Sequence, residues 1–118
     1  MIFDAGVFIS LEDPSKRRVV LALVQRMQAA GIEPATNEAA LAQAWRDPAR
    51  QVSMTRLVKG TTVHPFGDPR VIGLRCAASG TSDVVDASLA VLADQLQRSV
   101  LTTDARDLAK LGAPHQGL

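Results

Sequence analysis

Acidic side chains stand at the borders of apolar segments in this sequence. Asp4 directly follows "MIF", and the segment "TSDVVDASLAVLADQLQRSVLTTDARDL" holds Asp83 and Asp86 before one apolar run and Asp104 and Asp107 after the next. If these carboxylates converge, they repel each other and stay ionised at neutral pH only beside a cation. Carboxylate oxygens are ligands that Mg²⁺ or Mn²⁺ prefers, so a divalent metal site is the first hypothesis.

Helix capping is the second hypothesis for the same acids. Asp83 and Asp104 suit N-cap positions, and Asp86 and Asp107 each follow three residues later, where the helix dipole favours a negative charge. Asp4 can cap the helix that follows it, although a carboxylate buried at the end of an apolar strand needs a cation or hydrogen bonds to offset its desolvation. Capping accounts for each acid taken singly, so both hypotheses stay open at this point.

The elements that position these acids follow from short apolar runs that alternate with helical patterns. Strands are expected at 1–3, 32–36, 61–66 and 99–103, helices at 5–13, 14–31, 37–47, 48–60, 68–80 and 82–97, a last helix from Asp104, and a loose tail at 111–118. Each parallel neighbour needs a helical return, so this order predicts a mainly parallel sheet with helices on both faces. Ligands bind beyond the carboxyl ends of such strands, where Asp4 and Asp104 meet if their strands are neighbours.

The composition limits the class of protein. A chain of 118 residues that is 47% hydrophobic and 21% charged is expected to form one globular domain over residues 1–118. The single cysteine, Cys76, excludes a disulfide framework and a structural zinc pattern, and favours a reducing cytoplasmic setting. The N-terminus lacks a basic region, and the longest apolar run, "VVLALV", is too short for a bilayer, so neither secretion nor membrane anchoring is expected.

The sequence as a whole resembles a PIN domain, and specifically the VapC-type ribonuclease toxins of bacterial and archaeal toxin–antitoxin pairs. The matching segments are "MIFDAGVFISLE", "LAQAWR" and "DASLAVLADQLQRSVLTTDARDL". The last is the most specific, because an Asp-Ala opens a small-residue helix, an apolar strand follows, and Thr-Asp comes eighteen residues after the first Asp. The resemblance implies a three-layer αβα PIN-like fold with a short central sheet.

The resemblance also implies a set of site residues. Asp4, Asp86 and Asp104 match the three metal-site aspartates of the family, which makes them candidate catalytic residues and ligands of Mg²⁺ or Mn²⁺. Asp83 matches an additional acid one turn earlier, and Asp107 is assigned a supporting position.

One position departs from the family pattern. The family usually has a Glu in the pattern "LAE", where this sequence has Gln43, an uncharged and weaker Mg²⁺ ligand. Gln43 is therefore placed in a supporting role, as are Thr102 and Thr103, which match the small hydroxyl residue beside the last aspartate. Glu38 is a candidate catalytic acid that supplies the missing charge, although an acid in a first helical turn needs no other role than the dipole. The departure leaves open a weakened or lost activity.

The activity implied by the resemblance is metal-assisted hydrolysis of an RNA phosphodiester, with one or two Mg²⁺ or Mn²⁺ ions that activate water and stabilise the leaving 3′-oxygen. Residues 16–75 hold ten of the thirteen Lys and Arg and only four acids, which indicates either a basic face for RNA or a solvated surface. The candidates for phosphate contact are Arg46, Arg50, Arg56 and Lys59. The implied partners are a VapB-like antitoxin and a second copy in a homodimer.

Three other functions are weighed against this one. A degenerate PIN-like binding module, which dimerises or docks without cleaving, is favoured by Gln43 and opposed by the retained aspartates. An acid–base ribonuclease using His64 and His115 lacks a matching constellation around either residue. A structure-specific DNA nuclease on the same fold needs insertions that a chain of 118 residues does not contain.

Overall fold

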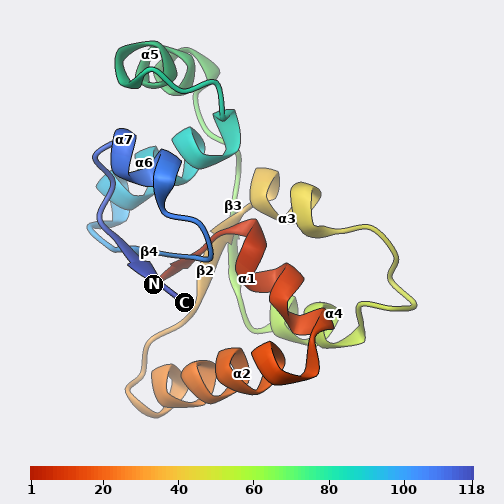
Figure 1. Cartoon of the computed structure of the whole chain (residues 1–118). Coiled ribbons are helices and arrows are strands. Elements are labelled where there is room, and N and C mark those ends of the chain that lie inside the picture. The colour runs from red at the N-terminus through yellow and green to blue at the C-terminus, as the bar shows by residue number, and fades with distance from the viewer.

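Five short parallel strands form the central sheet of the computed structural model, which describes residues 1–118 throughout (Figure 1). The strands are β1 (Ile2–Phe3), β2 (Ala35–Asn37), β3 (Thr62–His64), β4 (Val100–Thr102) and β5 (His115–Gly117). Their order is β3-β2-β1-β4-β5, and every neighbouring pair is parallel. The expected mainly parallel sheet is confirmed.

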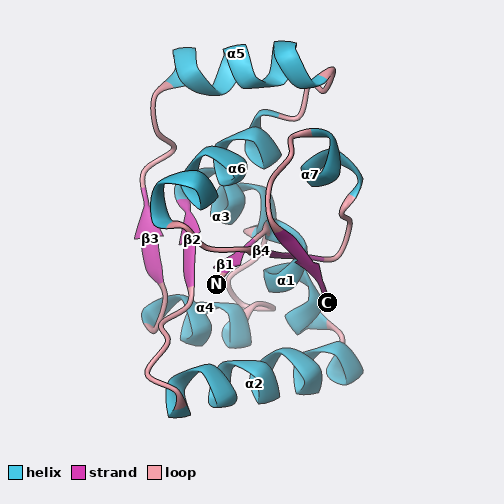
Figure 2. Cartoon of the chain, turned by 90° about the vertical axis from the view of Figure 1, so that its left-hand side faces the viewer, coloured by secondary structure: helices cyan, strands magenta, loops and turns pink.

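Helices cover both faces of this sheet. They are α1 (Ala5–Ile9), α2 (Pro14–Ala29), α3 (Glu38–Ala44), α4 (Val52–Lys59), α5 (Pro69–Ser79), α6 (Val84–Leu96) and α7 (Arg106–Lys110), with a 3-10 turn at Ser10–Glu12. Figure 2 shows α5, α6 and α7 on one side of the strands, and α2 and α4 on the other. None of these helices combines the length and the apolar character needed to cross a bilayer.

Side chains that alternate along the strands divide the core into two halves. Ile2 and Val100 point to the side of α5, α6 and α7, where they belong to a cluster of 14 buried residues. Phe3 and Leu101, the next residue of each strand, belong to a second cluster of 13 with α1, α2 and α4. Successive residues of a strand face opposite sides of a sheet, so even two-residue strands contribute to both halves. The result is a three-layer arrangement.

The expectation of a loose C-terminal tail is wrong. Residues 115–117 form β5 on the outer edge of β4, where Val100 N donates to Pro114 O at 2.9 Å and Leu118 N donates to Thr102 O at 2.9 Å. The three side chains of β5 are exposed, so the strand is held by its backbone and carries no apolar pattern. It covers an edge of β4 that would otherwise be open.

The helix predicted before Pro48 and the helix predicted from Pro48 are both shorter than expected. The first ends at Ala44, and the second begins only after Gln51. The buried Gln51 side chain holds the loop between them, because its Oε1 accepts from Arg46 N at 2.9 Å and Asp47 N at 3.0 Å, and its Nε2 donates to Ala44 O at 2.9 Å. A side chain therefore pairs backbone groups that a continued helix would have paired itself.

Candidate metal centre

The sheet reverses its direction of growth between β1 and β4. From β1 the chain adds β2 and β3 on one side, and it later returns to the other side of β1 as β4. At such a switch point a crevice opens beyond the carboxyl ends of the strands. Phe3 pairs with Leu101, and Asp4 N donates to Leu101 O at 3.1 Å. The expectation that these two strands are neighbours, with Asp4 and Asp104 beyond their ends, is confirmed.

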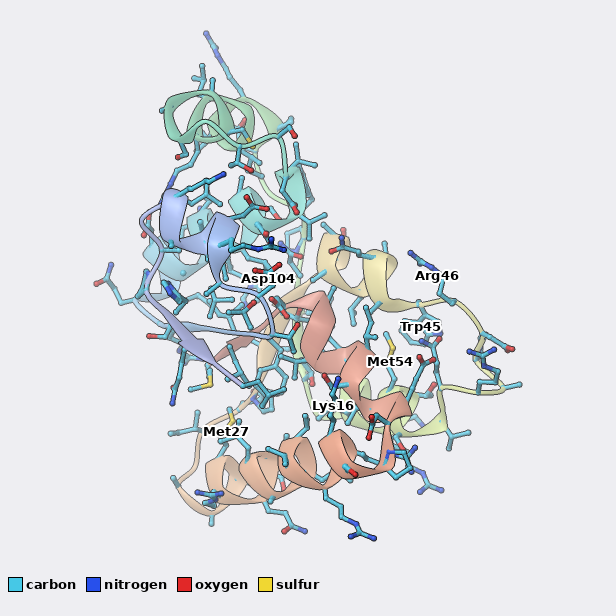
Figure 3. The ribbon with its side chains drawn as sticks, viewed as in Figure 1. Lys16, Met27, Trp45, Arg46, Met54 and Asp104 are labelled. Carbon is cyan, nitrogen blue, oxygen red and sulfur yellow. The ribbon has the colours of Figure 1, made fainter.

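A hollow of about 350 Å³ lies at this place. Its walls come from α1, α3, the start of α6 and the segment after β4, and Figure 3 shows Asp104 near the middle of the molecule and Arg46 just beyond α3. The lining residues are Asp4, Ala5, Gly6, Ile9, Gln43, Arg46, Asp83, Asp86, Thr103, Asp104 and Asp107. The five aspartates that the sequence singled out thus share one hollow, which we call the acidic hollow.

Three of these aspartates form the tightest group. One carboxylate oxygen from each of Asp83, Asp86 and Asp107 lies within 4.8 Å of the others. Asp83 is also the N-cap of α6, because its Oδ1 accepts from Asp86 N at 3.0 Å. Thr81 was missed by the sequence analysis: its hydroxyl donates to Asp107 Oδ1 at 3.2 Å and accepts from Asp83 N at 3.2 Å. The Thr-x-Asp pattern before a helix was the available signal for the bond to Asp83, but not for the bond to Asp107.

Asp4 is both a cap and a wall of the acidic hollow. Its Oδ1 accepts from Val7 N at 3.3 Å, and the side chain caps α1 while the residue is only 8% exposed. Burial raises the pKa of Asp4, with hydrogen bonds from the Val7 and Gly6 amides opposing the shift. The capping and metal hypotheses are therefore compatible for this residue.

Asp104 is bound by an arginine that the sequence analysis did not single out. Arg106 Nε lies 3.0 and 3.2 Å from the two carboxylate oxygens, and its Nη2 lies 2.6 Å from Oδ2. These hydrogen bonds lower the pKa of Asp104 to about 2. The last helix begins at Arg106 rather than at Asp104, because the Thr102 hydroxyl holds the Asp104 backbone, accepting from its N at 3.0 Å and donating to its O at 2.9 Å.

Asp86 has the most perturbed electrostatic environment in the acidic hollow. Burial raises its pKa to about 7, and the charges of Asp83, Asp4 and Asp107 add to the shift. A carboxyl with such a pKa is only partly ionised at neutral pH, and a nearby cation would favour its ionised form. The donors around it are carboxylate and other oxygens, with no His or Cys in the lining. This donor set fits Mg²⁺ or Mn²⁺.

Gln43 and Glu38, the two candidates for the second acid position, lie in different places. Gln43 lines the acidic hollow, and its supporting role there stays a prediction. Glu38 is exposed in the first turn of α3 and is absent from that lining. The structure therefore brings an amide, and not the expected carboxylate, to this wall. The catalytic role of Glu38 stays a prediction.

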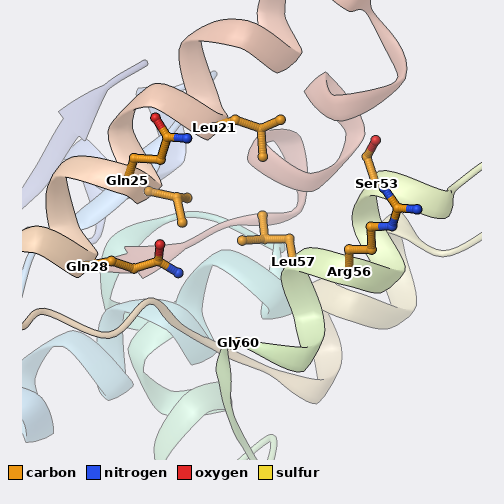
Figure 4. A pocket seen from close by; sticks show the side chains of 8 residues that line it. Leu21, Gln25, Gln28, Ser53, Arg56, Leu57 and Gly60 are labelled. Carbon is orange, nitrogen blue, oxygen red and sulfur yellow. The ribbon is translucent and has the colours of Figure 1, made fainter.

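The basic candidates are spread over different surfaces. Arg46 lines the acidic hollow, and its Nη1 donates to Ala42 O at 3.1 Å. Arg50 lines a separate hollow beside the start of α4, and Lys59 is exposed at the end of that helix. Arg56 lines a third hollow between α2 and α4, shown in Figure 4. Only Arg46 is brought to the acids, and contact of all four with RNA stays a prediction.

Gly6 carries the first testable prediction. A Cβ at this position would lie 2.0 Å from Thr103 Oγ1 and 3.2 Å from Thr103 Cβ. We expect Gly6→Ala to push Thr103 away from α1 and to lower the free energy of unfolding by about 1–3 kcal/mol, the usual cost of overpacking. Urea denaturation measures this. In a chain that already carries Thr103→Gly, the substitution Gly6→Ala should cost much less stability. If Gly6→Ala lowers the free energy of unfolding equally with and without Thr103→Gly, the predicted clash with Thr103 is contradicted.

Comparison with known proteins finds matches to the fold of this chain but none to its sequence. No family model matches the sequence, and no curated protein does. The structure is similar to PAE2754 from Pyrobaculum aerophilum, with a TM-score of 0.70 at 16% identity over 97% of this chain and 81% of that one. It is also similar to FitAcB from Neisseria gonorrhoeae (TM-score 0.71, 12% identity, 97% and 94% covered) and to FitAB bound to an IR36 DNA fragment (0.68, 13%, 98% and 93%). The expected PIN-like three-layer fold is confirmed.

Proposed function

We propose that this chain is a metal-dependent endoribonuclease that acts as the toxin of a VapBC-like toxin–antitoxin pair in the cytoplasm. The observation that carries the proposal is the acidic hollow, in which five aspartates converge at the switch point of a PIN-like parallel sheet. Helix capping explains why Asp4 and Asp83 are acidic, but it does not explain why the acids share one hollow with Asp86, which carries a raised pKa.

The residues of the acidic hollow have different roles in the proposed reaction. Asp83, Asp86 and Asp107 would hold the cation, and Asp4 and Asp104, which line the same hollow beyond the ends of β1 and β4, would add negative charge beside it. When bound, Mg²⁺ or Mn²⁺ activates water and neutralises charge on the phosphate. No side-chain nucleophile is needed. Thr102 holds the backbone of Asp104 in place, and Arg46 offers a positive charge at the rim for a phosphate of the RNA.

An antitoxin partner and a homodimer belong to the same proposal, on the strength of the resemblance. The hollow between α2 and α4, of about 300 Å³, supports a docking role, because Leu21, Val24 and Leu57 line it together with Arg56. Leu21 is 39% exposed although it belongs to a helix that packs on the core. This surface offers apolar contact that the chain itself leaves partly uncovered.

The test of the proposed activity is cleavage of end-labelled RNAs, structured and unstructured, by the purified protein with Mg²⁺, Mn²⁺ or EDTA. We expect products with either metal and none with EDTA or with Asp4→Asn. The matched control is Asp94→Asn, because Asp94 lies on α6 but pairs with Arg75 away from the acidic hollow and should leave cleavage unchanged. Products that persist in EDTA, or that Asp4→Asn leaves intact, would refute the proposal.

A catalytically weakened binding module is the second candidate, and Gln43 on the wall of the acidic hollow favours it. If the missing carboxylate limits the rate, Gln43→Glu should increase metal-dependent cleavage. If the chain only docks with partners, wild type and Gln43→Glu should both be inactive, and calorimetry should detect no binding of Mn²⁺.

A further inference from the structure

A single buried hydrogen bond between two side chains links the walls of the acidic hollow. Asn37 Nδ2 donates to Ser88 Oγ at 2.8 Å, and the two residues are 0% and 1% exposed. The other hydrogen bonds that join two side chains in this protein are exposed or partly buried. This bond connects residues 51 positions apart in the sequence.

The hydrogen bonds around this pair fix its direction. Ser88 Oγ donates its only proton to Val85 O at 2.6 Å, so its oxygen must accept from Asn37. Asn37 Oδ1 accepts from Ala40 N at 2.9 Å and thereby caps α3, which leaves the amide nitrogen to face Ser88. Each of these groups has a partner, and exchanging the amide oxygen and nitrogen of Asn37 would break both of its bonds.

The pair sits directly behind the acids. Ser88 lies two positions after Asp86 on α6, and two residues turn a helix by about 200°, so the buried Ser88 side chain lies on nearly the opposite face of α6 from Asp86. Asn37 begins α3, which carries Gln43 on the opposite wall of the acidic hollow. The bond ties the start of α3 to α6 two residues beyond Asp86.

A buried polar pair of this kind adds little net stability compared with two apolar side chains of the same shape. The pair instead favours one packing of α3 against α6, because any other packing would leave a buried donor or acceptor without a partner. We propose that Asn37 and Ser88 are positioning residues that hold the Asp86 carboxylate where a divalent cation binds. This inference rests on the proposed function, since it assigns a purpose to the metal centre.

The test is Mn²⁺ affinity, measured by isothermal titration calorimetry, alongside urea denaturation. Ser88→Ala removes the acceptor, whereas Asn37→Ser keeps a good N-cap for α3 but is too short to reach Ser88. We expect each variant to weaken Mn²⁺ binding roughly tenfold, as loss of a residue that orients a ligand typically does. The double variant should lose no more than either single variant, because all three break the same bond.

The control is Thr61→Val, which also removes a buried hydroxyl. Thr61 is 8% exposed and donates to Leu57 O at 2.7 Å beyond the end of α4, outside the lining of the acidic hollow. It should lower stability and leave the Kd for Mn²⁺ unchanged. Wild-type Mn²⁺ affinity in folded Ser88→Ala and Asn37→Ser would overturn the positioning role alone. Failure of wild type itself to bind Mn²⁺ would instead overturn the metal centre, and the positioning role with it.

Discussion

Asp86→Asn is expected to reduce metal-dependent RNA cleavage by at least roughly a hundredfold, and to make the metal-free protein more stable at pH 8. The loss of rate follows from the position of Asp86 in the tightest carboxylate group. A cation contributes several kcal/mol of transition-state stabilisation, and each 1.36 kcal/mol is tenfold in rate. The gain in stability follows because Asn carries no charge where the pKa of the carboxyl is raised to about 7.

The two readouts distinguish a functional acid from a structural one. Cleavage by wild type and by Asp86→Asn is compared in Mn²⁺, and urea denaturation of both is compared in EDTA. If Asp86 served only the fold, its replacement would lower stability and reduce cleavage in proportion to the unfolded fraction. A variant that is stable and fully active would contradict the assignment of Asp86 to the metal centre.

The metal-free protein should also lose stability as the pH rises from about 4 to about 7. In this window the unfolded chain has released the proton of Asp86, whose ordinary pKa is 3.8, while the folded chain keeps it up to a pKa of about 7. Because the folded state binds more protons, the free energy of unfolding falls with rising pH. Asp86 is partly exposed, which allows solvent screening, so we expect a loss of roughly 1–2 kcal/mol.

The pKa shifts of the neighbouring acids do not reverse the expected fall in stability with rising pH. The pKa of Asp4 is also raised by burial, and it acts in the same direction. The pKa of Asp104 is lowered to about 2, so its contribution has the opposite sign but is confined to pH below about 4. Urea denaturation in EDTA from pH 4 to pH 8 measures the effect. The stability difference between Asp86→Asn and wild type should grow with pH, and a difference independent of pH would contradict the raised pKa of Asp86.

The acids at the switch point were predictable from the sequence. Asp4 and Asp104 each follow a short apolar run, and the rule that parallel strands present their carboxyl ends at the same edge is enough to bring such residues together. The helical spacing of Asp83 and Asp86 was equally informative, because residues three apart share a face. The pairing of Phe3 with Leu101 then supplied the register that the sequence left open.

Other parts of the site were not predictable because they depend on long-range or backbone contacts. The Thr81 hydroxyl reaches Asp107 across 26 positions of sequence, and no local pattern signals such a contact. The sequence predicts a helix from Asp104, but α7 begins at Arg106, so Asp107 is its second residue. A start two residues later corresponds to a rotation of about 200° around the helix, and the sequence does not indicate it. A strand such as β5, whose three side chains are all exposed, gives no periodic signal either.

The central position of β1 has a consequence for protein synthesis. β1 is translated well before β4, its neighbour in the sheet, which begins only at Val100. At roughly 5–20 residues per second, a ribosome needs several seconds or more between the two strands. During this interval the nascent chain carries Asp4 without the residues that complete its surroundings. The metal centre proposed for this chain would therefore be incomplete, and unable to bind a cation fully, until β4 and the residues that follow it have been synthesised and have left the ribosome.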